Sequence, residues 1–140
     1  MNADETRVVL MQVLQLAASA GNLAVAVEKF VAPSAIVHIP SGEIGRGQQA
    51  SGGFLMEAYE AFPDLTLSLQ DVMVEADRAA VQYVMEGTHT GPFRGFAPTG
   101  KSVKLPVCTV LRFEAGLIVE IWYYANLFAP LVGTLRPVST

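Results

Sequence analysis

Four long runs with a strand-like pattern fill most of the second half of this 140-residue sequence, and they constrain the fold more than any other feature. Two residues separate the first run from the second and the third from the fourth, so each pair is predicted to form a tight antiparallel hairpin. The connection between the pairs is rich in glycine and proline and is predicted to be a structured loop. The four runs span residues 65–75, 78–90, 102–114 and 117–126.

Three helices are predicted ahead of these strands, because apolar side chains recur there at helical spacing. Asn22 is a candidate N-cap for the second helix, Pro33 ends that helix, and Phe62-Pro63 ends the third. The predicted helices span 4–20, 22–30 and 48–61; a short strand at 35–39 and a plain glycine-rich loop at 42–47 lie between the last two, and a brief helical turn at 127–133 follows the last strand.

Helices that precede long antiparallel strands predict a single α+β domain over residues 1–140. A sheet of such long strands must twist and curl. Helices packed on its concave side would leave a cone with a mouth, and that shape favours a ligand pocket. We expect about five or six strands, mostly antiparallel.

The composition is apolar for a soluble domain, with 51% hydrophobic and 16% charged residues. A large buried pocket or a subunit interface would both remove this apolar surplus from water. We therefore predict a homodimer in which the outer faces of the long strands meet. Strand parity places Val84, Cys108, Val110 and Ile121 on that outer face.

Charge and cysteine content exclude several partners. The formal net charge is -4 and the nine basic residues are scattered, so nucleic acid is not an expected partner. No apolar run reaches the length of a membrane span and the acidic start does not resemble a signal peptide, so we expect a cytoplasmic protein with no membrane partner. Cys108 lies in an apolar run and is interpreted as an inert buried thiol, and no Cys/His spacing indicates a metal site.

Side-chain parity selects most of the candidate site residues, because residues two apart on a strand share a face. Polar and aromatic groups on an otherwise apolar face are typical of a pocket lining. They are equally typical of a core in which each polar tip has one partner. The groups are Glu120, Trp122, Tyr124 and Asn126 on the last strand, Thr109 on the strand before it, and Tyr83 with His89 on the strand before that.

The two histidines, His38 and His89, each sit at the end of a predicted strand. Such a histidine is either a structural hydrogen-bonding group or a proton carrier. An unperturbed imidazole titrates near pH 6.5, so its neutral form can accept a proton near neutral pH without a large pKa shift. Neither histidine has metal-ligand companions nearby in the sequence.

Three segments resemble one known family. Residues 62–65 read FPDL, residues 87–101 are similar to the pattern GTHTGxFxGxxPTGK, and residues 112–122 are similar to RFxxGxIxExW. The spacings between these segments agree as well, and the likeness runs from about residue 30 to about residue 133. On these motifs the sequence resembles the SnoaL-like polyketide cyclases.

The resemblance implies a nuclear-transport-factor-like fold, a cystatin-like α+β barrel shared with ketosteroid isomerases. It also implies an intramolecular aldol ring closure without metal or organic cofactor, in which an acidic side chain removes a proton alpha to a carbonyl and polar groups stabilise the enolate. The sequence departs from the family at Asn126, where Asp is frequent, and at Thr109, where some members have His. An amide at position 126 can bind or polarise a substrate oxygen, but it cannot act as the base.

Two of the candidates also have a structural interpretation. Asp64 follows Pro63 at a turn, where Asp often binds backbone amides, and Glu120 could brace Arg112 across the last hairpin. The catalytic candidates are His89, His38 and Glu120; the substrate-binding candidates are Asn126, Trp122, Tyr124, Thr109, Asp64 and Tyr83; no metal and no cofactor is expected.

Three functions stay open on this basis. The first is a cofactor-independent enzyme of the cyclase or isomerase type that acts on an apolar carbonyl substrate. The second is a non-catalytic protein that binds a small apolar or aromatic ligand on the same fold. The third is an enzyme that opens an epoxide or hydrolyses an ester. Because one fold hosts several chemistries, the choice has to be argued from the site.

Overall fold

The computed structural model describes residues 1–126 and begins with three helices. They are α1 (Ala3–Ala17), α2 (Ala20–Phe30) and α3 (Gly47–Ala61). Asn2 caps α1 in a capping box with Glu5, which satisfies two backbone groups at the helix start. The cap of α2 is Ser19, whose side chain accepts from the backbone of Asn22. The prediction of Asn22 as the cap was therefore wrong by three positions, while the three helices themselves are confirmed.

Six strands form one curved, unclosed sheet. Its order is β2-β1-β6-β5-β4-β3, and every neighbouring pair is antiparallel except β1 and β6, which are parallel. The α+β architecture with a mostly antiparallel sheet is thus confirmed. The strands are β1 (Val31–His38), β2 (Ile44–Arg46), β3 (Thr66–Glu75), β4 (Arg78–Thr88), β5 (Ser102–Glu114) and β6 (Leu117–Tyr124).

The glycine-rich segment at 42–47 is not a plain loop, because it contains β2. The turn after β1 brings the chain back so that Ile44 pairs with His38. Gly42 has a φ of 94°, a left-handed conformation that glycine adopts without strain, and this allows the tight return. Three residues are too short a run for a sequence pattern to distinguish a strand from a loop. The predicted turn at 127–133 lies outside the described residues.

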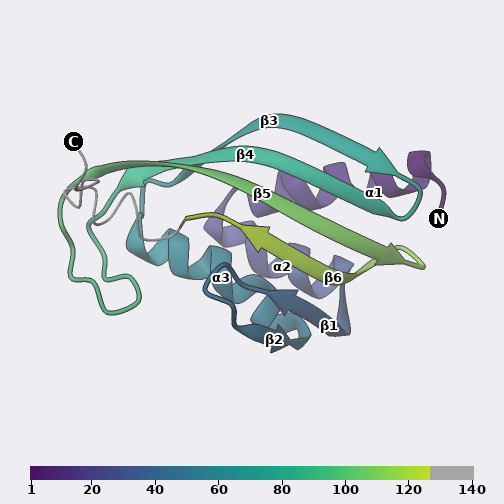
Figure 1. Cartoon of the computed structure of the whole chain (residues 1–140), viewed down its shortest axis with the longest axis horizontal. Coiled ribbons are helices and arrows are strands. Elements are labelled where there is room, and N and C mark those ends of the chain that lie inside the picture. The colour runs from purple at the N-terminus through teal and green to yellow at the C-terminus, as the bar shows by residue number, and fades with distance from the viewer. Residues whose placement is uncertain (127–140) are drawn as a thin grey trace, which may run out of the picture.

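The helices cover one face of the sheet, as Figure 1 shows, and the core lies between them and that face. Burial alternates along β5, where Val107, Thr109 and Leu111 point to the helices and the residues between them point away. We call the helix-covered face the inner face and the opposite one the outer face. Among residues 1–126, no helix is both long and apolar enough to cross a membrane.

A β-bulge in β6 changes which side chains reach the inner face. Phe113 of β5 pairs with Ile118, but the adjacent Arg112 pairs with Glu120, so Val119 is an extra residue in β6. Beyond this point the alternation is reversed, and Ile121 and Tyr123 are the buried residues. The prediction that Ile121 lies on the outer face was wrong for this reason.

Candidate functional site

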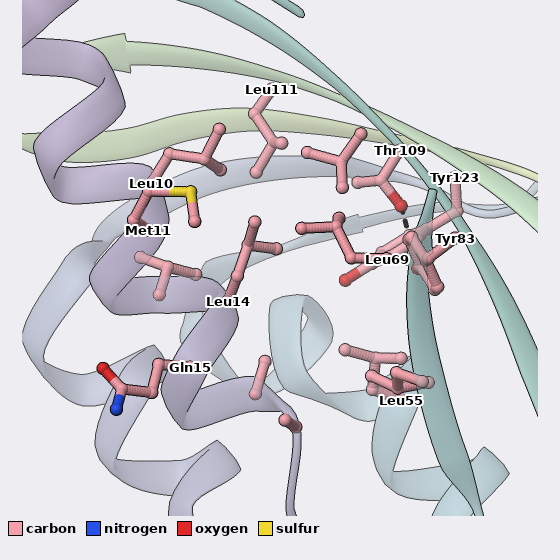
Figure 2. A pocket seen from close by; sticks show the side chains of 15 residues that line it. Leu10, Met11, Leu14, Gln15, Leu55, Leu69, Tyr83, Thr109, Leu111 and Tyr123 are labelled. Atoms are coloured by element: carbon pink, nitrogen blue, oxygen red, sulfur yellow. Dashed lines mark hydrogen bonds between the residues drawn. The ribbon is translucent and has the colours of Figure 1, made fainter. Parts of the chain in front are cut away.

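A cavity of about 470 Å³ lies between α1, α3 and the inner face of the sheet. Figure 2 shows its wall, which is made mainly of aliphatic side chains from α1 and from strands β3 to β5. Met11 and Leu69 are 44% and 48% exposed and lie at its open side, whereas Leu10 is fully buried. A volume of this size accommodates a small organic molecule. The surrounding wall would hold such a molecule chiefly by removing apolar surface from water.

Two polar side chains meet in this wall. The hydroxyls of Tyr83 on β4 and Thr109 on β5 lie 2.9 Å apart, and both residues are buried. Burial raises the pKa of Tyr83 to about 12, so its phenol is neutral near pH 7. The two hydroxyls share one hydrogen bond, which leaves one O–H proton that can be donated to a third oxygen. Both residues are substrate-binding candidates of the sequence analysis, and both lie in the wall of this cavity; substrate binding by them stays a prediction.

The other two buried tyrosines each donate their hydroxyl proton to a backbone carbonyl. The Tyr123 hydroxyl donates to the Ser51 carbonyl at 3.3 Å, and the Tyr59 hydroxyl donates to the Ala17 carbonyl at 2.7 Å. Burial raises the pKa of both phenols, so they also stay neutral. Tyr123 lines the cavity. Strand parity did not predict this position of Tyr123. The bulge in β6 places Tyr123 on the inner face, where parity had placed its neighbours Trp122 and Tyr124.

No described residue that lines the cavity is a carboxylate, a histidine or a lysine. Gln15 is the remaining polar side chain of the lining; it lies on α1 and is exposed. The described wall can therefore bind an uncharged molecule and donate a hydrogen bond to it. It offers no group that would accept a proton near neutral pH.

Trp122, Tyr124 and Glu120 point to the outer face and not to this cavity. The prediction that Trp122 and Tyr124 share a face with Thr109 was wrong, because the extra residue Val119 reverses the side-chain alternation. Asn126 lies two residues beyond the end of β6, is exposed, and is not one of the cavity-lining residues.

His38 and Glu120, two of the catalytic candidates, meet on the outer face. Their Nε2 and Oε2 atoms lie 2.7 Å apart, and Arg112 approaches the other Glu120 oxygen at 3.2 Å. The hydrogen bond from His38, followed by the contact with Arg112, lowers the pKa of Glu120. The interpretation of Glu120 as a brace for Arg112 is thus confirmed as geometry. A catalytic role for either candidate stays a prediction.

His89 is fully buried at the far end of β4 from the cavity. Its Nδ1 accepts from the Thr99 backbone N–H at 3.2 Å and lies 2.9 Å from the Thr99 hydroxyl. With Nδ1 as acceptor, Nε2 carries a proton; this atom is buried, has no hydrogen-bond partner among residues 1–126, and its ring packs near Phe62. His89 lies six positions after Tyr83, or roughly 20 Å along an extended chain. His89 therefore organises the β4–β5 loop, and proton transfer by it stays a prediction.

Asp64 binds a backbone amide, as its sequence context suggested, but the amide belongs to Thr88 at the end of β4 and not to its own turn. Its two carboxylate oxygens accept from the Thr88 backbone N–H at 2.7 Å and from the Thr88 hydroxyl at 2.9 Å. These hydrogen bonds, the backbone one first, lower the pKa of Asp64. Substrate binding by Asp64 stays a prediction, since its oxygens already serve to fix the end of β4.

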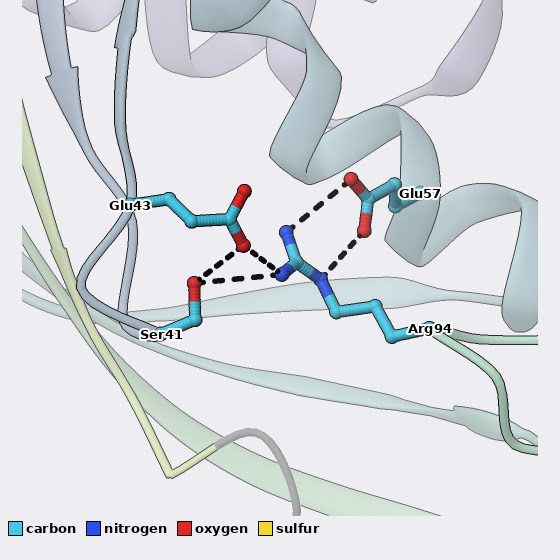
Figure 3. Close-up of polar contacts among 4 residues, drawn as sticks. All are labelled: Ser41, Glu43, Glu57 and Arg94. Atoms are coloured by element: carbon cyan, nitrogen blue, oxygen red, sulfur yellow. Dashed lines mark hydrogen bonds and ion pairs between the residues drawn. The ribbon is translucent and has the colours of Figure 1, made fainter.

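A charged cluster around Arg94 had no counterpart in the sequence analysis. Figure 3 shows the guanidinium of Arg94 between Glu57 of α3 and Glu43 of the β1–β2 turn, with an N···O distance of 2.9 Å to each. Arg94 belongs to the long β4–β5 loop and thus ties this loop to two other elements. The two carboxylates offset the charge of the guanidinium. Because they belong to α3 and to the β1–β2 turn, the cluster holds the β4–β5 loop against both elements. Within residues 1–126, no group of three His, Cys, Asp or Glu side chains is placed to hold a metal ion.

Comparison with known proteins gives a consistent result. The model of the family described as SnoaL-like polyketide cyclase matches residues 8–132. No curated protein matches the chain. The sequence resemblance noted above is confirmed by the family match.

Solved structures with the same architecture cover nearly the whole chain. A protein from Jannaschia sp. CCS1, provisionally described as a SnoaL-like polyketide cyclase, has a TM-score of 0.85 at 23% identity over 96% of this chain and 95% of its own. AclR from Streptomyces galilaeus, provisionally described as a hydroxylase, has 0.79 at 26% over 98% and 86%. IdmH from Streptomyces antibioticus, provisionally described as a polyketide cyclase, has 0.75 at 25% over 92% and 97%. The expected nuclear-transport-factor-like fold is confirmed.

Proposed function

Because the chain belongs to the SnoaL-like polyketide cyclase family, we propose that it binds an uncharged, mostly apolar carbonyl compound in the cavity under α1 and polarises its oxygen. The observation that carries this proposal is the Tyr83–Thr109 pair, with its one uncommitted O–H, in an otherwise aliphatic wall. A buried hydrogen-bond donor is left unsatisfied when the cavity holds a pure hydrocarbon, so the pair favours a ligand that carries an oxygen.

Donation to a carbonyl oxygen is half of an aldol or isomerisation step. It stabilises the negative charge that develops on oxygen when the neighbouring carbon loses a proton. The hydroxyls of Tyr83 and Thr109 are suited to this task, since both are buried and remain neutral acceptors and donors near pH 7. Cyclase-type chemistry, without cofactor, is the reaction that this arrangement supports best.

The second candidate is a non-catalytic binding protein on the same fold. It is favoured by one specific observation: the described cavity residues include no base that could remove the proton. The same observation counts against opening of an epoxide, which would need a carboxylic acid or a histidine beside the oxygen. Binding and catalysis share the same cavity, so one set of compounds can test both.

The first experiment compares matched bicyclic probes: naphthalene, 2-acetonaphthone and 2-naphthoate. One added hydrogen bond of about 1 kcal/mol should make the ketone bind about fivefold tighter than the hydrocarbon, and the carboxylate should bind worst because its charge would be buried unpaired. The double variant Tyr83→Phe with Thr109→Val should lose the preference for the ketone and keep its affinity for naphthalene. Each single variant keeps one hydroxyl and should keep the preference.

The control for this series is Tyr124→Phe, which removes a hydroxyl on the outer face and should change nothing. Affinities can be measured by titration calorimetry or thermal shift. Equal affinity of the parent for ketone and hydrocarbon would refute the oxygen anchor. Failure of all three probes to bind would refute the cavity as a ligand site.

The second experiment separates catalysis from binding. In D2O, an enzyme that removes a proton alpha to the carbonyl exchanges the methyl protons of 2-acetonaphthone for deuterium, which proton NMR follows directly. Exchange faster than in buffer, and lost in the double variant, supports the cyclase type. Exchange at the buffer rate with binding retained supports the binding protein.

A further inference from the structure

Helix α1 forms one side of the cavity, and hydrogen bonds to other elements fix it near its two ends. Near the first end, the fully buried Thr6 donates its hydroxyl proton to the backbone carbonyl of Ala76 at 2.6 Å. Ala76 lies in the turn between β3 and β4, and Figure 1 shows the start of α1 beside this turn. At the other end, the hydroxyl of Tyr59 on α3 donates to the carbonyl of Ala17 at 2.7 Å. We call these two contacts the end bonds of α1.

The stretch of α1 between the end bonds has only apolar contacts with the rest of the fold. Thr6 and Ala17 lie eleven positions apart, or roughly 16 Å along a helix. Within residues 1–126, no side chain from 7 to 16 forms a hydrogen bond or an ion pair with another element. This stretch lines the cavity with four apolar side chains and with the exposed Gln15. In the described chain, therefore, the end bonds are the polar contacts that set the distance of this stretch from the sheet.

Apolar attraction alone would draw this stretch of α1 toward the sheet. Protein interiors are close-packed, and an unfilled apolar space costs stability in proportion to its volume. Apolar side chains of α1 and of the sheet face each other across about 470 Å³. Movement of α1 toward the sheet would reduce this space, but it would also stretch or bend the end bonds, and a hydrogen bond weakens steeply away from its preferred geometry. The end bonds therefore oppose the closure of the cavity.

Both end bonds are shielded from water. Thr6 and Tyr59 are 0% and 8% exposed, so water competes little for their hydroxyl protons. A hydrogen bond is electrostatically stronger in such surroundings than in water, and a buried group that loses its partner is costly. Burial also raises the pKa of Tyr59, so the phenol keeps the proton that it donates. Tyr59 lies one helical turn after Leu55, which lines the cavity, so this end bond borders the cavity directly.

We propose that Thr6 and Tyr59 are positioning residues, which hold α1 at the distance from the sheet at which the cavity can receive a ligand. Neither side chain is part of the cavity lining, so both act through α1. The consequence for binding rests on the proposed function, because it takes this cavity to be the ligand site. When an end bond is lost, α1 approaches the sheet in a larger fraction of the molecules. The affinity for every ligand then falls with the fraction of molecules that stay open.

The first test needs no ligand. Pressure favours the unfolded state, and the volume change of unfolding scales with the internal space that unfolding eliminates. Thr6→Val keeps the shape of the side chain and removes the hydroxyl, and Tyr59→Phe does the same at the other end. In each variant the magnitude of the volume change should fall by about a quarter or more, because α1 moves into the space. Thr6→Ser keeps a hydroxyl and should keep the value of the parent.

Matched controls remove the same groups at exposed positions. Thr90→Val lies in the β4–β5 loop and Tyr124→Phe lies on the outer face, and both should leave the volume change and the ligand affinity as in the parent. Circular dichroism checks that each variant is folded at a temperature well below its melting temperature, and all measurements are made there. If one of the two end-bond variants does not fold, the other decides.

The second test measures the affinity of the folded variants for two of the bicyclic probes. Loss of one end bond should weaken the binding of naphthalene and of 2-acetonaphthone by the same factor, about fivefold, which corresponds to one hydrogen bond. The preference for the ketone should remain, because Tyr83 and Thr109 keep their hydroxyls. The double variant Tyr83→Phe with Thr109→Val should give the opposite pattern, with the preference lost and the affinity for naphthalene retained.

The outcomes separate this proposal from the proposed function. If no probe binds the parent but the volume change falls in both end-bond variants, the end bonds hold the cavity open and the cavity is not the ligand site. A parent-like volume change in a folded Thr6→Val or Tyr59→Phe would overturn the role of that residue, even if its melting temperature is lower, because the end bond would then only stabilise the fold. If Thr6→Ser behaves like Thr6→Val, the hydroxyl is not the group that acts, and the proposal fails for Thr6.

Discussion

Asp64 links the end of α3 to the end of β4 through one side chain. It accepts from both the backbone and the hydroxyl of Thr88, at 2.7 and 2.9 Å. The neighbouring position 87 must be glycine in this arrangement, because a Cβ there would lie 2.8 Å from Phe62 Cβ and 3.1 Å from Asp64 Oδ1. The carboxylate and the glycine therefore form one packing unit at the start of the β4–β5 loop.

We predict that Asp64→Asn lowers the melting temperature at pH 7 and flattens its dependence on acid. Since the pKa of Asp64 is lowered in the folded state, its stabilisation is complete well above the unfolded pKa of about 3.9 and is lost as the pH falls through the folded value. The difference between parent and variant should therefore shrink below about pH 4. Thermal melts from pH 3 to 7 measure it, with Glu28→Gln, an exposed carboxylate on α2, as control. A difference that grows on acidification would contradict the assignment.

At the scale of elements, the long hairpins and helices could be predicted and the bulge could not. Two-residue turns at 76–77 and 115–116 set the pairing of β3 with β4 and of β5 with β6. Strands β4 and β5 pair without a register shift, so parity along them gives the inward direction of Tyr83 and Thr109. The bulge at Val119 leaves no compositional signal, and a single inserted residue exchanges Trp122 for Tyr123 on the inner face.

The helix α3 contains two adjacent glycines that should respond differently to alanine. A Cβ on Gly53 meets no atom within 4 Å, so Gly53→Ala should raise the free energy of unfolding by about 0.5–1 kcal/mol. A Cβ on Gly52 lies 3.1 Å from Val27 Cγ2 of α2, so Gly52→Ala should gain less or lose stability. Urea denaturation measures the free energy of unfolding of both variants. The gain in helix propensity is the same for both, so a difference between them reports the contact with Val27. Equal gains would mean that α2 and α3 pack less closely than described.

At the scale of the whole molecule, the apolar side chains of the sequence are distributed between the core, the cavity wall and the two faces of the sheet. Half of the residues are hydrophobic, and composition alone indicated a pocket or an interface without locating either. The inner side of the curved sheet leaves space under α1, whereas Val110 and Trp122 on its outer side stay half-buried. The position of the cavity does not follow from residue content, because it depends on how the strands bend and pair.

A cavity lowers the stability of the free protein. A larger side chain that fills it should therefore raise the stability and reduce ligand binding. Leu14 on α1 points into the space under the sheet (Figure 2). We predict that Leu14→Phe raises the melting temperature of the free protein by a few degrees, equivalent to about 1 kcal/mol, and abolishes the thermal shift that 2-acetonaphthone gives the parent. Val8→Phe, at an exposed position of the same helix, should change neither. Loss of stability with ketone binding retained would contradict the placement of Leu14 beside the ligand space. In that case the added ring would be displacing packed atoms and would leave the space for the ligand unchanged.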